Sequence, residues 1–257
     1  MCYRLLMRLS LINNKTKEHK LNYFKIKPVL IIFLVFTSII IGDNRFYVWT
    51  YEYKTMERGK AEFEHYLTFK APQMDSLAES VTTVHNVEFE FGMNDHFDFS
   101  IYQNFQQPAD GNFQYTGYKL RARYKFGEKN QYLMDPLLYF EYKGKPDFTK
   151  HVLEGKLILA KDFESFNYAI NPVFEIEYEN GEKEYELKYN AGSCYRINKL
   201  LRIGLEIKGG KNGHYLGPVI SHGNDTFWVA LGSAVAFTEI KNNKPGFMLR
   251  MILGIHL

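Results

Sequence analysis

The chain has 257 residues, enough for one large β domain or two small ones, and its 19 Tyr, 21 Phe and 2 Trp make it rich in aromatic side chains. Residues 1–42 contain seven of the 32 basic residues and one of the 29 acidic residues, which leaves 25 and 28, a net charge of −3, so the charge gives no case for a nucleic-acid partner. The mildly polar hydropathy excludes helical membrane spans as the bulk of the chain, and a single cysteine beyond the leader, Cys194, excludes a cysteine-based zinc site or redox pair.

The N-terminus has the pattern of a targeting segment. Seven scattered Lys and Arg residues precede a thirteen-residue apolar run, Val29–Ile41, which ends at Gly42 and Asp43. A membrane-spanning helix needs about 20 apolar residues, so this run predicts a cleaved secretory signal peptide over residues 1–42. An uncleaved anchor is the alternative. The aromatic residues 43–58 are expected to form a periplasmic lead-in segment below the folded domain.

From residue 59 the chain consists of alternating apolar and polar stretches separated by turn signals, with no sustained 3.6-residue period. Each of these stretches has the length of a β-strand. We expect twelve strands, give or take two, at residues 60–70, 81–91, 96–105, 115–126, 136–143, 151–161, 166–178, 184–195, 199–208, 214–221, 226–237 and 247–257.

Each strand has one apolar and one charged face, because neighbouring residues of a strand point to opposite sides of the sheet. One face of residues 201–208 carries Leu201, Ile203, Leu205 and Ile207, and the other carries Arg202, Gly204, Glu206 and Lys208. A soluble barrel turns the apolar face inward, whereas a membrane barrel turns it outward. The export signal and the aromatic residues near the strand ends favour the membrane barrel.

The lengths of the connections agree with that choice. Those after the first, third, fifth and eleventh strands are longer or richer in turn formers, whereas most of the others are short. Asn180-Gly181 and Asn212-Gly213 indicate tight hairpins with positive φ. Long loops at one end and short turns at the other are typical of outer-membrane barrels, and a chain that starts and finishes at the short-turn end needs an even number of strands.

The last stretch, Gly246–Leu257, presents an unbroken apolar face to the end of the chain and resembles the closing strand of bacterial outer-membrane β-barrels. Residues 51–64 and His214–Pro218 resemble a group of uncharacterised, porin-like barrels of this class. The resemblance implies an all-β, transmembrane, antiparallel up-and-down barrel over residues 59–257 in the Gram-negative outer membrane. Its implied partners are outer-membrane lipid and the barrel-assembly machinery, although this chain ends in Leu257 where the family's assembly signal usually ends in Phe or Trp.

The candidate functional residues are the charged side chains expected in the lumen. The cationic residues follow one another along a single strand: Lys119, Arg121, Arg123 and Lys125. The acidic residues are expected on strands well away from it: Glu62, Glu64, Glu88, Glu90, Glu175, Glu177, Glu184 and Glu186. A cationic stripe facing acidic walls would create a transverse field and orient small charged or polar solutes. A lumen closed by salt bridges is the alternative, because twelve strands lie between the packed and the open barrel sizes.

The sequence gives little support for an enzyme. A lipid-modifying activity would need Ser221 and His222 to cooperate, but adjacent strand residues point to opposite faces and no partner acid is evident. The seven histidines beyond the leader are scattered, so we expect neither a metal site nor a cofactor. His65 and His85 fall on the apolar faces of their strands, where a position near the membrane interface would explain them.

Overall fold

The computed structural model describes residues 45–75, 77, 80–224 and 226–257, which all belong to one compact unit. The predicted signal peptide, residues 1–42, lies outside the described residues. The described part of the chain contains no long apolar helix of the kind that crosses a bilayer.

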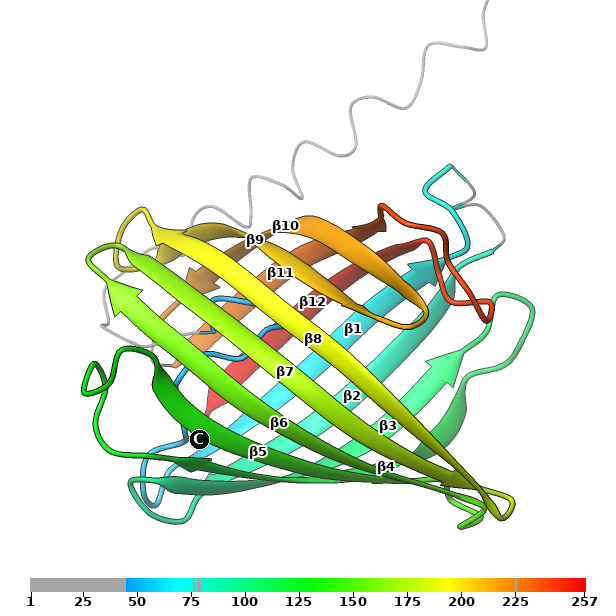
Figure 1. The fold of residues 1–257 in the computed structure, drawn as a ribbon, viewed down its shortest axis with the longest axis horizontal. Helices are drawn as coiled ribbons and strands as arrows, with labels where there is room; N and C mark the ends of the chain where they lie inside the picture. Colours follow the sequence, from blue (N-terminus) through cyan, green and yellow to red (C-terminus); the bar gives the residue numbers. More distant parts are fainter. Residues whose placement is uncertain (1–44, 76, 78–79, 225) are drawn as a thin grey trace, which may run out of the picture. The chain divides into compact units, whose positions relative to one another are not determined.

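Twelve antiparallel strands close into a barrel (Figure 1), as the sequence predicts. Every predicted strand bound lies within two residues of the observed one. The strands are β1 (Ala61–Ala71), β2 (Thr82–Gly92), β3 (Phe97–Gln107), β4 (Gln114–Lys125), β5 (Asp135–Gly144), β6 (Lys150–Phe163), β7 (Phe166–Glu179), β8 (Glu182–Arg196), β9 (Leu201–Gly210), β10 (Gly213–Gly223), β11 (Phe227–Ala236) and β12 (Phe247–His256).

The barrel closes where the last strand pairs with the first. β12 runs antiparallel to β1 with a continuous register from Glu62 opposite His256 to Ala71 opposite Phe247. Each of the twelve described strands therefore has a neighbour on both sides, and none of them has an open edge. This closure is what allows strands to cross hydrocarbon, where an unpaired backbone group would cost several kcal/mol.

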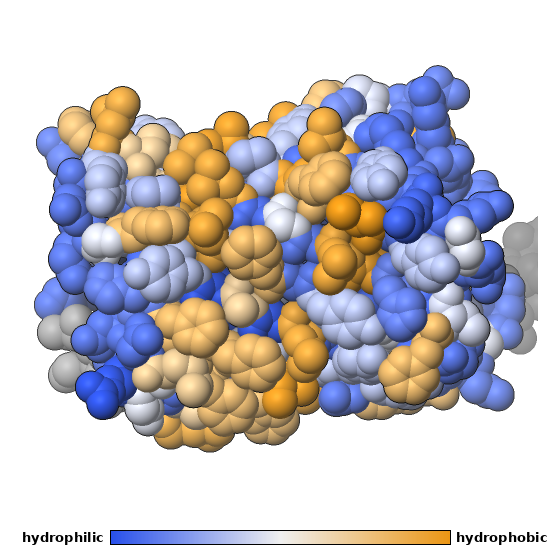
Figure 2. Space-filling view, turned by 60° about the horizontal axis from the view of Figure 1, so that its bottom comes forward, coloured by the Kyte–Doolittle hydropathy of each residue, from blue (hydrophilic) through white to orange (hydrophobic). Residues whose placement is uncertain are grey.

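The apolar face of the strands points outward. Leu120, Phe140, Leu205 and Leu231 are all more than a third exposed, whereas the alternate residues Arg121, Glu141 and Glu206 are buried inside the barrel. Figure 2 shows hydrophobic surface gathered around the middle of the barrel, with hydrophilic surface toward both ends. This distribution is that of a transmembrane barrel, with lipid as the outer solvent.

The two ends of the barrel differ in their connections. We call the end at which the described chain enters β1 and leaves β12 the termini end, and the opposite end the loop end. The loop end carries the longer segments 72–81 and 237–246, while most turns at the termini end are short. The exception at the termini end is the nine-residue segment 126–134. At the loop end, Asn180 and Gly181 both have positive φ, as predicted for a tight hairpin. The second hairpin turns one residue earlier than expected, at Lys211 and Asn212.

An arginine substituted in the middle of the outer face tests whether that face of the strands contacts lipid. Leu231→Arg places a charge at the centre of β11, where it should cost about 2–4 kcal/mol of the free energy of unfolding in lipid vesicles. Leu133 lies in the segment after β4 and is 92 % exposed, so Leu133→Arg should change the free energy of unfolding by less than about 0.5 kcal/mol. Equilibrium unfolding by denaturant measures both changes, and equal effects would contradict an outward-facing Leu231.

Candidate functional site

Residues 45–56 of the N-terminal segment lie inside the barrel. The predicted position of this segment below the barrel is therefore wrong for these residues. Phe46, Tyr47, Val48 and Trp49 are between 0 and 6 % exposed, and they pack against lumen-facing residues such as Val219 and Ala234. The physical reason is that four consecutive apolar and aromatic side chains leave water readily, and a twelve-stranded wall leaves room for them inside. We call residues 45–56 the plug.

Two polar side chains of the wall bind the backbone of the plug. The Glu206 carboxylate on β9 accepts hydrogen bonds from the backbone N–H groups of Val48 (2.9 Å), Trp49 (2.9 Å) and Thr50 (2.7 Å). Asn171 on β7 accepts from the N–H of Tyr51 at 2.6 Å and donates to its carbonyl at 3.0 Å. The plug has no regular secondary structure, so these wall residues satisfy backbone groups that would otherwise be buried without partners.

Glycines in the wall make room for the plug. A Cβ atom at Gly192 on β8 would lie 2.4 Å from the Tyr47 ring. One at Gly232 on β11 would lie 2.5 Å from a methyl group of Val48. Both positions face the lumen, and both distances are too short for van der Waals contact. The wall therefore accommodates the plug in two ways: glycines leave space for its side chains, and polar side chains bind its backbone.

The central arginines of the cationic strand meet acidic residues directly. Arg121 contacts Glu88 at 2.8 Å and Glu90 at 2.5 Å. Arg123 contacts Asp98 at 2.6 Å and also pairs with Glu90. The expectation that the acidic residues lie well away from this strand is wrong for Glu88 and Glu90.

The strand register explains these contacts. Arg121 on β4 lies opposite Ser100 on β3, and Ser100 lies opposite Glu90 on β2. Because Ser100 is small, the arginine side chain reaches across it to the carboxylate. A buried charge needs a partner of opposite sign, and this row provides one.

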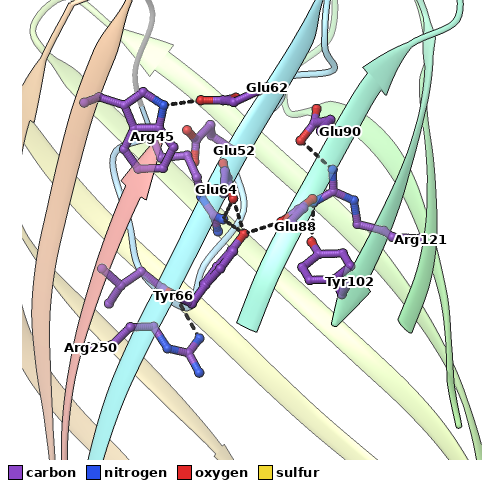
Figure 3. A network of polar contacts seen from close by, with 12 residues as sticks. Arg45, Glu52, Glu62, Glu64, Tyr66, Glu88, Glu90, Tyr102, Arg121 and Arg250 are labelled. Carbon is purple, nitrogen blue, oxygen red and sulfur yellow. Dashed lines mark hydrogen bonds and ion pairs between the residues drawn. The ribbon is translucent and has the colours of Figure 1, made fainter. Parts of the chain in front are cut away.

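The remaining acidic residues near the termini end take part in the same network (Figure 3). Glu62 accepts a hydrogen bond from the indole of Trp228, and Glu64 pairs with Arg45 of the plug at 3.5 Å. Oxygens of Glu62, Glu64 and Glu90 all lie within 4.8 Å of one another. Each of these carboxylates contacts a protein donor, so protein contacts account for the grouping.

The other predicted lumen residues lie either toward the loop end or at the termini end of the barrel. Lys119 lies toward the loop end, where it contacts Glu141 at 3.0 Å and lies 3.9 Å from the centre of the Tyr102 ring. Lys125 is half-buried at the termini end of β4. Toward the loop end the acidic residues all pair with lysines: Glu175 and Glu186 with Lys188, Glu177 with Lys150, and Glu184 with Lys211. The cationic strand and the acidic residues therefore form local ion pairs rather than two opposed walls.

A cavity of about 380 Å³ lies in the lumen, with Val48, Trp49 and Tyr51 of the plug among its walls. Among the described residues, four carboxylates line it: Glu141, Glu154, Glu175 and Glu186. Eight cationic side chains line it: Lys70, Lys119, Lys143, Lys156, Lys188, Lys208, Lys244 and Arg250. The cavity is thus strongly polar and carries an excess of positive charge.

Ser221 and His222 lie apart, as expected, but the expectation that the histidines are scattered is wrong for His65 and His85, which lie together on one face. Ser221 is buried on the lumen side of β10, while the adjacent His222 lies on the opposite face, as strand alternation requires. His65 and His85 lie on the outer face, with ring nitrogens 3.1 Å apart, and the His85 ring packs edge-on against Phe113. The expected position of these two histidines near the membrane interface stays a prediction.

Sequence reasoning missed the plug and the residues that hold it. Glu206 and Asn171 lie about 155 and 120 residues from their plug partners in the sequence. One usable signal was the pair of glycines, Gly192 and Gly232, on the lumen faces of predicted strands. Glycine weakens a strand interior and often marks the close approach of another backbone or side chain.

The comparisons with known proteins place the fold. No protein-family model matches the sequence, and no curated protein matches it. Three solved structures share the fold at low sequence identity. An outer-membrane channel from Pseudomonas putida F1 matches with a TM-score of 0.55 and 10 % identity, over 82 % of this chain and all of the channel.

The other two structures are the porins NanC and KdgM. NanC matches with a TM-score of 0.52 and 8 % identity, over 75 % of this chain and 98 % of the porin. KdgM, in a complex with disordered oligogalacturonate, matches with a TM-score of 0.51 and 10 % identity, over 77 % and 97 %. Each match covers nearly the whole of the known barrel, so the chain has the porin-like barrel fold.

A valine at Gly192 tests the fit between plug and wall. In Gly192→Val the new side chain occupies the space of the Tyr47 ring, so the plug should be displaced and Trp49 should become accessible to water. Iodide quenching of tryptophan fluorescence should rise at least about twofold. Gly155→Val is the matched control, because a Cβ there meets nothing within 4 Å on the outer face. Unchanged quenching in Gly192→Val, with the barrel still folded, would contradict the observed packing.

Proposed function

We propose that the protein is an outer-membrane channel for small charged solutes, closed in this structure by its own N-terminal plug. The observation that carries the proposal is the polar cavity of about 380 Å³ inside the wall. A barrel built only as a membrane anchor has no need for an internal cavity lined by twelve charged side chains. Solutes would pass down their gradient, without chemical change.

The outer surface and the fold support the location. An apolar band around a closed barrel fits lipid, and the solved barrels that share the fold are named as porins or as an outer-membrane channel. We therefore propose export by the N-terminal signal, and assembly in the outer membrane by the barrel-assembly machinery through β12.

A closed structural barrel is the second candidate, and the plug itself favours it. Phe46–Trp49 are fully packed, and the arginine network beneath them fills the lumen toward the termini end. In that case the loops would contact partners, and the lumen charges would serve stability. The two functions differ in one respect: only a channel conducts when the plug is released.

Glu206→Ala should release the plug, because three backbone N–H groups lose their acceptor at once. Each charge-assisted hydrogen bond contributes about 1.5–3 kcal/mol, so the open fraction should rise at least about tenfold. Single-channel recording in planar bilayers measures this as more frequent or longer openings of the variant compared with the unmodified chain.

Glu177→Gln, at the partly exposed loop end, is the control and should behave like the unmodified protein. A second variant that lacks residues 45–56 should conduct continuously. If both folded variants carry no current, the channel is excluded and the closed barrel remains.

A further inference from the structure

The cations that line the cavity differ in how they are neutralised. On the side formed by β5 to β8, the lysines contact carboxylates. Lys143 alone contacts three, at 2.9–3.2 Å, those of Glu141, Glu154 and Glu175. Lys188 contacts Glu175 at 2.6 Å. We call this the paired wall.

The side formed by β9, β12 and β1 is different. Lys208, Arg250 and Lys70 line the same cavity, and within the described residues the structure shows no ion pair from any of them to a carboxylate. Arg250 donates instead to the hydroxyl of Thr68 at 2.9 Å and to the carbonyl of Val48 at 3.2 Å. We call these three residues the unpaired cluster.

The carboxylate on this wall is already engaged. Glu206 lies two residues before Lys208 on β9, but both of its oxygens accept hydrogen bonds from the plug backbone. Lys208, Arg250 and Lys70 repel one another, and the Glu206 charge offsets this repulsion only in part. In a confined lumen of low effective dielectric, this repulsion is greater than it would be in water.

Trp49 of the plug lies between two members of the cluster. The Lys208 ammonium is 5.4 Å, and the Arg250 guanidinium carbon 5.5 Å, from the centre of its ring system. Contact with an aromatic face contributes about 0.5–2 kcal/mol but does not neutralise a charge. The three cations are only partly buried, so the cluster is open to the cavity.

We propose that the unpaired cluster is a binding site for a small anion that carries a carboxylate or phosphate group. This inference names the solute class of the proposed channel and rests on it. Arg250 offers the guanidinium donors that Thr68 and Val48 do not use, and Lys208 and Lys70 supply compact positive charge. Trp49 and Tyr215 offer apolar faces to the rest of the solute. A cavity of about 380 Å³ falls within the usual size of small-molecule sites. The cavity lies in the lumen, enclosed by the strands, so membrane lipid does not reach it.

Calorimetric titration of the folded full-length protein with inorganic phosphate, at constant ionic strength, tests the site. Lys208→Gln and Lys70→Gln should each raise the dissociation constant about tenfold, since each removes one uncompensated charge. Lys188→Gln is the matched control: it lines the same cavity but belongs to the paired wall, and it should stay within about twofold of the unmodified protein. Glucose, a small solute without charge, should show no binding.

Three results would overturn the site: equal phosphate affinity in all variants, an equal loss in Lys188→Gln, or glucose binding as tight as phosphate binding. The outcome is separable from that of the channel. A protein that binds phosphate through Lys208 but never conducts keeps the site and loses the channel. One that conducts without binding phosphate keeps the channel and loses the site.

Discussion

The arrangement inside this barrel depends on one carboxylate that is bound by three consecutive backbone N–H groups. A segment without regular secondary structure enters a protein interior only if its peptide groups find partners, and Glu206 provides partners for residues 48–50 from a single position on β9. The same hydrogen bonds hold the Glu206 carboxylate toward the plug, and among the described residues Lys208 forms no ion pair with it. One carboxylate therefore helps to close the lumen while the lysine two residues along the strand stays without a salt bridge to that carboxylate.

The lumen is divided by charge along its length. Toward the termini end, six carboxylates (Glu52, Glu62, Glu64, Glu88, Glu90 and Asp98) lie near Arg45, Arg121 and Arg123. Four of the six contact arginine, while Glu62 accepts from the Trp228 indole and Glu52 from the backbone N–H of Phe46. Around the cavity the balance is reversed, and lysine predominates. The plug lies between these regions and contacts both, since Arg45 reaches Glu64 while Trp49 lies beside Arg250. A solute that entered from the loop end would meet the mainly positive cavity before the acidic network.

The strands of the barrel could be predicted from the sequence because successive side chains of a membrane-barrel strand point alternately to lipid and to the lumen. Leu201 to Lys208 shows this alternation plainly, and it predicts the strand. The outward direction of its apolar face was predicted from the export signal and the aromatic residues near the strand ends. The site could not be predicted in the same way. The pairing of Arg121 with Glu90 depends on the register of three strands and on the small size of Ser100. The plug depends on contacts across more than a hundred residues, and the aromatic pattern of residues 46–53 fits a lumen as well as an interface.

A short link joins the plug to the first strand, so a plug that leaves the lumen remains close to it. Met56 donates its backbone N–H to Asp98 at 2.9 Å, and β1 begins at Ala61, so only four residues separate the plug from the first strand. A plug that leaves the lumen stays tethered at its mouth, at an effective concentration in the millimolar range. Rebinding is then intramolecular, and a competitor in solution at micromolar concentration would have to bind its site about a thousandfold more tightly to keep the lumen open.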